Sequence, residues 1–145
     1  MEVYSIGFTQ RRAQDFFGAL KRAGIRQLLD VRINNSSQLA GFTKREDLPF
    51  FLRELCGVEY THDRRLAPTQ ELLRAYQRKN ISWPEYEVAF LALMVERQVE
   101  RHIDQSFFTV PTVLLCSEAK PDRCHRRLIL EYLNQKWGGL KIVHL

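Results

Sequence analysis

The chain has 145 residues, a length that suits one domain with a single hydrophobic core and excludes a multidomain assembly. Hydrophobic residues make up 45% of the sequence and charged residues 27%, which excludes a disordered or fibrous chain. Lys and Arg number 22 against 17 Asp and Glu, so the formal net charge is +5. This charge modestly favours anionic partners such as phosphates or nucleic acid.

The sequence predicts a protein with no membrane segment. Residues 1–5 lack a basic leader followed by an apolar run, and no stretch approaches the roughly 20 apolar residues that cross a bilayer. Three cysteines, an odd number, are typical of a reducing compartment. We therefore expect a cytoplasmic protein without a membrane partner.

The first half of the chain predicts alternating strands and helices. A β-prone run over 3–9 precedes a helix over 12–23, whose apolar residues recur with the spacing of one helix face. A second strand over 26–32 contains a nearly continuous apolar run, which is typical of a strand covered on both faces. A helix that ends at Cys56 and a third strand over 58–62 follow.

The second half continues this alternation. Helices are predicted over 69–79, about 82–103 and about 122–137, and strands over 112–116 and 141–145. The sequence Ser-Trp-Pro-Glu at the start of the long middle helix matches a capping box with a proline in the first turn. The apolar face of that helix is predicted from residues with helical spacing: Val88, Leu91, Ala92, Val95 and Val99.

Strands that alternate with helices predict right-handed crossovers and one mainly parallel sheet. We expect an α/β fold over 1–145, a single-domain three-layer sandwich of about five mainly parallel strands with helices on both faces. Ligands of such sheets bind beyond the carboxyl ends of the strands. Polar residues that directly follow strands are therefore candidates for a functional site.

Four such residues are predicted to bind substrate: Thr9, Asp30, Arg32 and Asn34. Asp30 and Arg32 are two residues apart, so their side chains point to the same face of a strand. They form either a structural ion pair or a pair that orients the substrate.

Cys124 is the predicted nucleophile, or a thiol that binds the substrate. It lies near the start of the last helix, where the helix dipole, His125 and nearby arginines favour a thiolate. Glu118 and His125 are the acid–base candidates, and Arg126 is predicted to bind the anion. The alternative is that Cys124 is a small buried residue that packs between the helix and the sheet.

The turn over 117–125 is a candidate anion cradle, because backbone N–H groups converge at the start of a helix. Six residues separate Cys116 from Arg123, whereas the loop of a tyrosine phosphatase has five. The turn therefore has the position of a phosphatase loop without its spacing.

A metal site is not expected. Cys116, Cys124 and His125 have the ligand types of zinc, but Cys-x7-Cys-His is not a known zinc spacing. His62 would have to complete the site. We therefore predict no metal and no cofactor.

Three pairs of adjacent arginines follow strands or open helices: Arg11 and Arg12, Arg64 and Arg65, and Arg126 and Arg127. On one rim, beside a polar crevice, they would suit a nucleotide or nucleic acid. The alternative is ordinary solvated surface charge.

Four segments carry a resemblance to a known family: Tyr4-Ser5-Ile6-Gly7, Leu29-Asp30-Val31-Arg32, Gly41-Phe42-Thr43-Lys44, and Leu115-Cys116-Ser117-Glu118 followed by Cys124-His125-Arg126-Arg127. In order and spacing they resemble the bacterial and archaeal Domain of Unknown Function 488 family. The resemblance covers essentially the whole chain and implies a compact α/β domain with its polar residues at one end. Members usually follow the first strand with Gly-His-Ser, whereas this chain has Gly7, Phe8 and Thr9. One acid–base group of the family is therefore replaced.

Together these features predict a small cytoplasmic enzyme that acts on an anionic, nucleotide-like or nucleic-acid substrate. The expected partner is a phosphate-bearing small molecule or nucleic acid. The competing hypothesis is a non-catalytic nucleic-acid-binding or ligand-binding module whose cysteines are structural. One unusually reactive cysteine would favour the enzyme.

Overall fold

A computed structural model describes residues 1–35, 41–118 and 120–145 and confirms the predicted α/β class. Five strands form one sheet in the order β3-β2-β4-β1-β5, and every neighbouring pair is parallel. The strands are β1 (Glu2–Gly7), β2 (Gln27–Asp30), β3 (Glu59–His62), β4 (Thr112–Cys116) and β5 (Lys141–His144). Each strand overlaps one of the five predicted runs.

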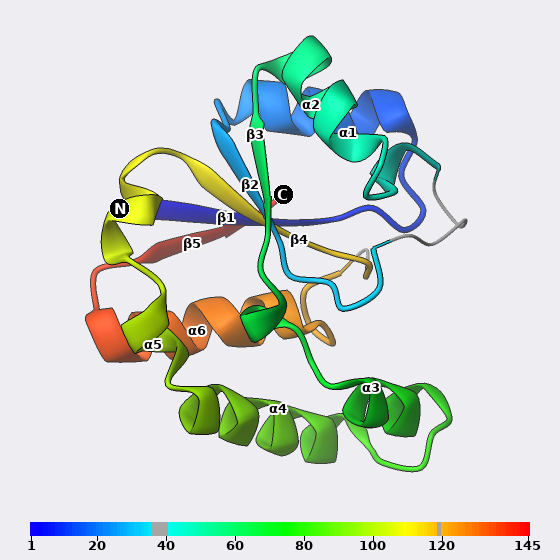
Figure 1. Cartoon of the computed structure of the whole chain (residues 1–145), viewed down its shortest axis with the longest axis vertical. Coiled ribbons are helices and arrows are strands. Elements are labelled where there is room, and N and C mark those ends of the chain that lie inside the picture. The colour runs from blue at the N-terminus through cyan, green and yellow to red at the C-terminus, as the bar shows by residue number, and fades with distance from the viewer. Residues whose placement is uncertain (36–40, 119) are drawn as a thin grey trace.

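Helices cover both faces of the sheet, as Figure 1 shows. On one face lie α1 (Ala13–Arg22) and α2 (Leu48–Cys56), and on the other lies α6 (His125–Trp137). The long helix α4 (Trp83–Arg97) packs on the outer side of α6, beside α3 (Gln70–Gln77). Within the described residues, no helix has the length and apolar character that a membrane crossing requires.

Each face of the sheet has its own apolar core. Phe16 and Leu20 of α1 pack with Leu115 of β4 on one side of the sheet. Leu114, the neighbouring residue in β4, packs with Ile129 of α6 on the other side. Every residue of β4 is buried, because a central strand of a parallel sheet is covered on both faces.

The long helix buries a different face from the one predicted. Its buried residues are Tyr86, Phe90 and Met94, spaced four residues apart. By contrast, the side chains of Val88 and Val95 are 71% and 56% exposed. The aromatic and methionine side chains carry more apolar area than valine, so the helix turns that face toward α6.

The same helix is shorter than predicted. It begins with the predicted capping box of Ser82 and Glu85, but it ends at Arg97. A separate turn, α5 (Val99–His102), follows. Between the two helices Gln98 adopts a left-handed backbone conformation with a φ of 50°. This conformation is unfavourable for a residue with a Cβ atom, because the Cβ approaches the following carbonyl oxygen.

Substituting Gln98→Gly is expected to raise the free energy of unfolding by about 0.5 kcal/mol, because glycine adopts this conformation without strain. Urea denaturation measures the change. A matched control is Ala92→Gly at an exposed position inside α4, which is expected to lower the free energy of unfolding by about 1 kcal/mol. Equal losses at both positions would contradict the prediction.

Candidate functional site

A pocket of about 1160 Å³ opens at the carboxyl ends of the central strands, where the fold rule predicts a site. Residues that follow β1, β2 and β4 line one side, among them Thr9, Arg32 and Glu118. Residues from α3, the start of α4 and the segment between them line the other side. The start of α6 closes the inner end with Cys124 and His125.

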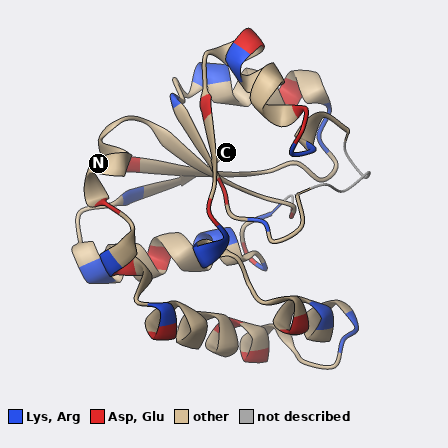
Figure 2. Cartoon of the chain, viewed as in Figure 1, with Lys and Arg blue, Asp and Glu red and all other residues tan. Residues whose placement is uncertain are grey.

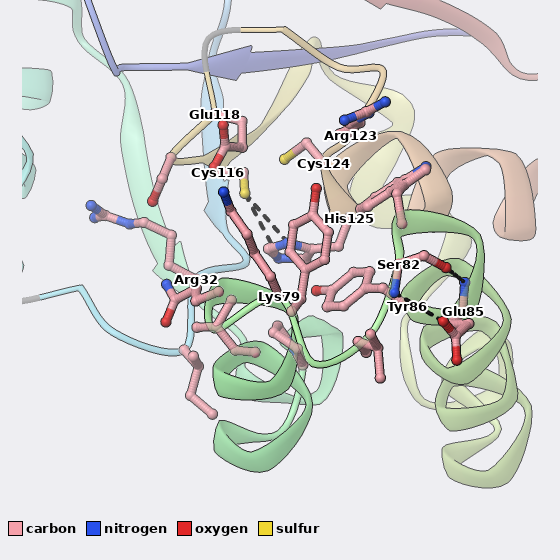
Figure 3. Close-up of a pocket in the computed structure, with 18 of the residues that line it drawn as sticks. Arg32, Lys79, Ser82, Glu85, Tyr86, Cys116, Glu118, Arg123, Cys124 and His125 are labelled. Carbon is pink, nitrogen blue, oxygen red and sulfur yellow. Dashed lines mark hydrogen bonds between the residues drawn. The ribbon is translucent and has the colours of Figure 1, made fainter.

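Three side chains gather at this inner end: Cys116, Cys124 and His125, here called the Cys–Cys–His cluster (Figure 3). Cys116 is the last residue of β4, Cys124 is the N-cap of α6, and His125 is the first residue of that helix. All three are buried, and their thiol and imidazole atoms lie within 4.8 Å of one another. The short turn from β4 to α6 therefore unites residues that are eight and nine positions apart.

The ring of His125 is held in a defined orientation. Its Nε2 lies 2.8 Å from the carbonyl oxygen of Val31, which only accepts hydrogen bonds, so Nε2 carries the proton. In the neutral ring, Nδ1 is then free of a proton, and it lies 3.4 Å from Sγ of Cys116. The same sulfur lies 4.0 Å from Nε2, so it sits over the face of the ring and not in line with the lone pair of Nδ1.

The two buried thiols differ in acidity. Burial acts to raise the pKa of Cys116, but the hydrogen bond with Cys124, the charge of Arg126 and two backbone N–H groups outweigh it and lower that pKa. Burial, and then the neighbouring Cys116, raise the pKa of Cys124 well above its ordinary value. The surroundings therefore favour the thiolate on Cys116, whereas the helix dipole and the neighbouring His125 and arginines predicted it on Cys124.

Arg126 is buried and is not among the residues that line the pocket. Its side chain is fully buried, and its Nε donates to Oγ of Ser5 at 3.1 Å. Its Nη1 donates to the backbone carbonyl of Glu118. That carbonyl passes so close to Gly7 that a Cβ atom there would overlap the oxygen. Instead of the predicted direct contact with an anion, Arg126 holds the backbone that carries Glu118.

Asp30 and Arg32 form a buried ion pair with two hydrogen bonds of 2.9 Å. The hydroxyl of Tyr60 donates to Asp30 at 2.6 Å, and Arg32 donates to the carbonyl of Thr43 at 2.7 Å. Arg32 lines the pocket, but Asp30 does not. The structure therefore supports the structural interpretation of Asp30.

Six of the eight predicted site residues line the pocket: Thr9, Arg32, Asn34, Glu118, Cys124 and His125. The hydroxyl of Thr9 donates to the carbonyl of Ser117, which ties the segments after β1 and β4 together. The amide of Gln70 donates to Asn34 at 2.8 Å. Residues 36–40, which follow Asn34 and Asn35 in the chain, and Ala119 of the candidate anion cradle lie outside the described residues.

An aromatic wall made of Tyr76, Trp83 and Tyr86 was not predicted from the sequence. The rings of Trp83 and Tyr86 are stacked with centroids 5.2 Å apart, and Tyr76 lies 5.6 Å from Trp83 and 5.1 Å from Tyr86. All three residues line the pocket. They belong to helices that do not directly follow a strand, so the search at strand ends passed over them. The aromatic spacing beside the capping box was the available signal.

The cations of the pocket also differ from the predicted arginine rim. Among the described residues, the cationic side chains that line it belong to Arg32, Lys79 and Arg123, and none of the three arginine pairs does. Arg65 instead pairs with Asp63. Figure 2 shows Lys and Arg interspersed with Asp and Glu along the helices.

Comparison with protein-family models shows to which family the chain is related. Residues 12–133 match the model described as Domain of unknown function DUF488. The chain belongs to this family. The resemblance in the sequence is thereby confirmed, and the cysteine segments that suggested it lie inside the matched region. Searches of curated proteins and of solved structures found no match.

This DUF488 chain has Phe8 at the position where the resemblance implies a histidine. Phe8 is buried, and the guanidinium of Arg32 lies over its ring at 5.2 Å from the centroid. The position therefore supports the ion pair at the end of β2 and supplies no proton-transfer group. The family description names no reaction, so function has to be argued from the site.

Proposed function

We propose that this DUF488 protein is a small enzyme that acts on an anionic, nucleotide-like substrate. One observation carries the proposal: a single pocket is lined by an aromatic wall, by three cations and by the Cys–Cys–His cluster. An aromatic face binds a planar base by stacking, and cations bind a phosphate. The interspersed surface charges favour a small molecule over a long nucleic acid.

The two sides of the pocket suggest how such a substrate binds. The base stacks on the aromatic wall, where Trp83 and Tyr76 are partly exposed. The phosphate binds to Arg123 and Lys79, which are exposed and line the same pocket. In this arrangement the substrate spans the pocket from α3 and α4 to the turn before α6.

The reacting atoms of the substrate lie against the Cys–Cys–His cluster, which forms the inner end of the pocket. Glu118 is the proposed general acid–base group, because its exposed side chain lines the pocket two residues after Cys116. The backbone of Glu118 is fixed by Arg126, which limits the positions available to the carboxylate. A Glu118→Gln variant is expected to bind the nucleotide normally and to lose turnover.

Binding of a nucleoside monophosphate is expected to quench the fluorescence of Trp83. The chain has two tryptophans, so a Trp83→Phe variant should lose the signal and a Trp137→Phe variant should keep it. Arg123→Ala is expected to weaken binding roughly tenfold to a hundredfold, because a charge-assisted hydrogen bond contributes about 1.5–3 kcal/mol. Titration at rising salt should show the affinity falling.

A matched control for that titration is Arg12→Ala, which removes an exposed arginine that does not line the pocket. The control should bind like the unmodified protein. The proposal is wrong if the unmodified protein binds none of the nucleoside monophosphates, or if the two arginine variants weaken binding equally. Product analysis with the bound nucleotide then identifies the bond that is broken.

A further inference from the structure

We infer that Cys116, Cys124 and His125 bind a zinc ion at the inner end of the pocket. Two thiolates and one imidazole are ligands of zinc, whereas Mg²⁺ and Ca²⁺ prefer oxygen ligands. The three side chains converge from the end of β4 and the start of α6 and are buried together. The inference goes beyond the proposed substrate and does not depend on it.

The distances between the ligand atoms are compatible with tetrahedral coordination after side-chain rotation. Zinc binds sulfur at about 2.3 Å and nitrogen at about 2.0–2.1 Å, so a tetrahedral angle places the two ligand atoms roughly 3.6 Å apart. Sγ of Cys116 lies 3.4 Å from Nδ1 of His125. The ligand atom of Cys124 lies within 4.8 Å of both. The three atoms are therefore close enough for side-chain rotations, including a turn of the His125 ring, to bring them to one ion.

The orientation of His125 provides a second, independent argument. A histidine that ligates a metal usually donates its other ring N–H to a carbonyl or carboxylate, which aims the ligating nitrogen. Here Nε2 bonds to the carbonyl of Val31, which leaves the lone pair of Nδ1 available to an ion. The hydrogen bond that a metal site requires is thus already present.

The site has three protein ligands and an open fourth position. His62, which the sequence argument required as the fourth ligand, bonds instead to the carbonyl of Arg32 at 2.7 Å and does not line the pocket. All three ligands line the pocket, so the open position faces it. Three protein ligands with a free position are typical of catalytic zinc sites, while structural sites have four. A water bound at the open position would face the same pocket that Glu118 lines.

The test uses a Cys56→Ser protein, in which Cys116 and Cys124 are the only cysteines. Zinc is added without nucleotide, free ion is removed by gel filtration, and elemental analysis with X-ray absorption measures the bound ion. We expect one zinc per chain, with two sulfur ligands at about 2.3 Å and lighter ligands at about 2.0 Å. Excess Mg²⁺ should not displace the zinc. Retention of no zinc, or a coordination shell without sulfur, would overturn the inference.

Two variants of the Cys56→Ser protein test which residues bind the ion. Adding Cys124→Ser to the Cys56→Ser protein is expected to weaken zinc binding at least a hundredfold in competition with a chelator, with folding checked by circular dichroism. Adding Glu96→Gln instead should leave the affinity unchanged, because Glu96 is exposed and does not line the pocket. Equal affinities in the two variants would overturn the assignment, and if the cysteine variant does not fold, the absorption data decide. A protein that binds zinc but no nucleotide would refute only the proposed function.

Discussion

Replacing Asp30 with Asn is expected to lower the free energy of unfolding by about 3–5 kcal/mol, because it leaves a buried arginine without its carboxylate. The side chains of Asp30 and Arg32 are 0% and 3% exposed, so water cannot solvate the guanidinium that has lost its partner. The hydroxyl of Tyr60 also loses a charged acceptor. Urea denaturation of the variant and of the unmodified protein measures the difference.

An exposed ion pair of the same residue types provides the control. Asp15 pairs with Arg12 on α1, and their side chains are 53% and 77% exposed. Asp15→Asn is therefore expected to change the free energy of unfolding by no more than about 0.5 kcal/mol. Adding Arg32→Met to the Asp30→Asn variant should restore part of the loss, because the unpaired charge is removed. Similar losses from the two Asp→Asn substitutions would show that burial does not decide the effect.

Gly7→Ala is the second substitution with a large expected effect. The added Cβ atom would overlap the carbonyl of Glu118, so the backbone after β4 has to move away from β1. That movement breaks the hydrogen bond from Arg126 and shifts the side of the pocket that carries Glu118. We expect a loss of about 2–3 kcal/mol in the free energy of unfolding, measured in urea. Nucleotide affinity should fall at least tenfold in the fluorescence titration.

Gly41→Ala is the matched control, since no atom of the described residues lies within 4 Å of the position that its Cβ would take. Its stability and nucleotide affinity should stay close to those of the unmodified protein. If Gly7→Ala keeps normal nucleotide affinity while losing stability, the backbone at Glu118 does not shape the pocket as described.

The sheet could be predicted from the sequence because each strand has a local signal. The apolar run around Leu28 and Leu29 and the glycine after α1 fix where strand and helix alternate, and parallel pairing follows from that alternation. The face of α4 could not be predicted with the same reasoning. The helical spacing of apolar residues gives Val88 and Phe90 equal weight. Packing buries the side chain with the larger apolar area, which is Phe90.

The site was predictable to the extent that its residues directly follow strands. Thr9, Arg32 and Glu118 were found in this way and line the pocket. The rule cannot locate Trp83, because α4 does not directly follow a strand and reaches the pocket through its packing on α3 and α6. The strand-end rule also cannot predict that the side chains of Cys116 and Cys124 lie close together, since this depends on the path of the turn between them.

The position of β1 in the sheet has a consequence for biosynthesis. Its two neighbours are β4 and β5, which are made more than 100 residues later. On the ribosome, β2 can pair with β3 early, but β1 has no partner strand until residue 112 and beyond have left the exit tunnel. Its residues therefore lack their neighbouring strands for most of synthesis, a period in which unpaired strands are prone to aggregate. Strand β4 lies between β2 and β1, so the sheet is complete only after β4 has been inserted. The pocket at the ends of these strands therefore forms in one of the last steps of folding.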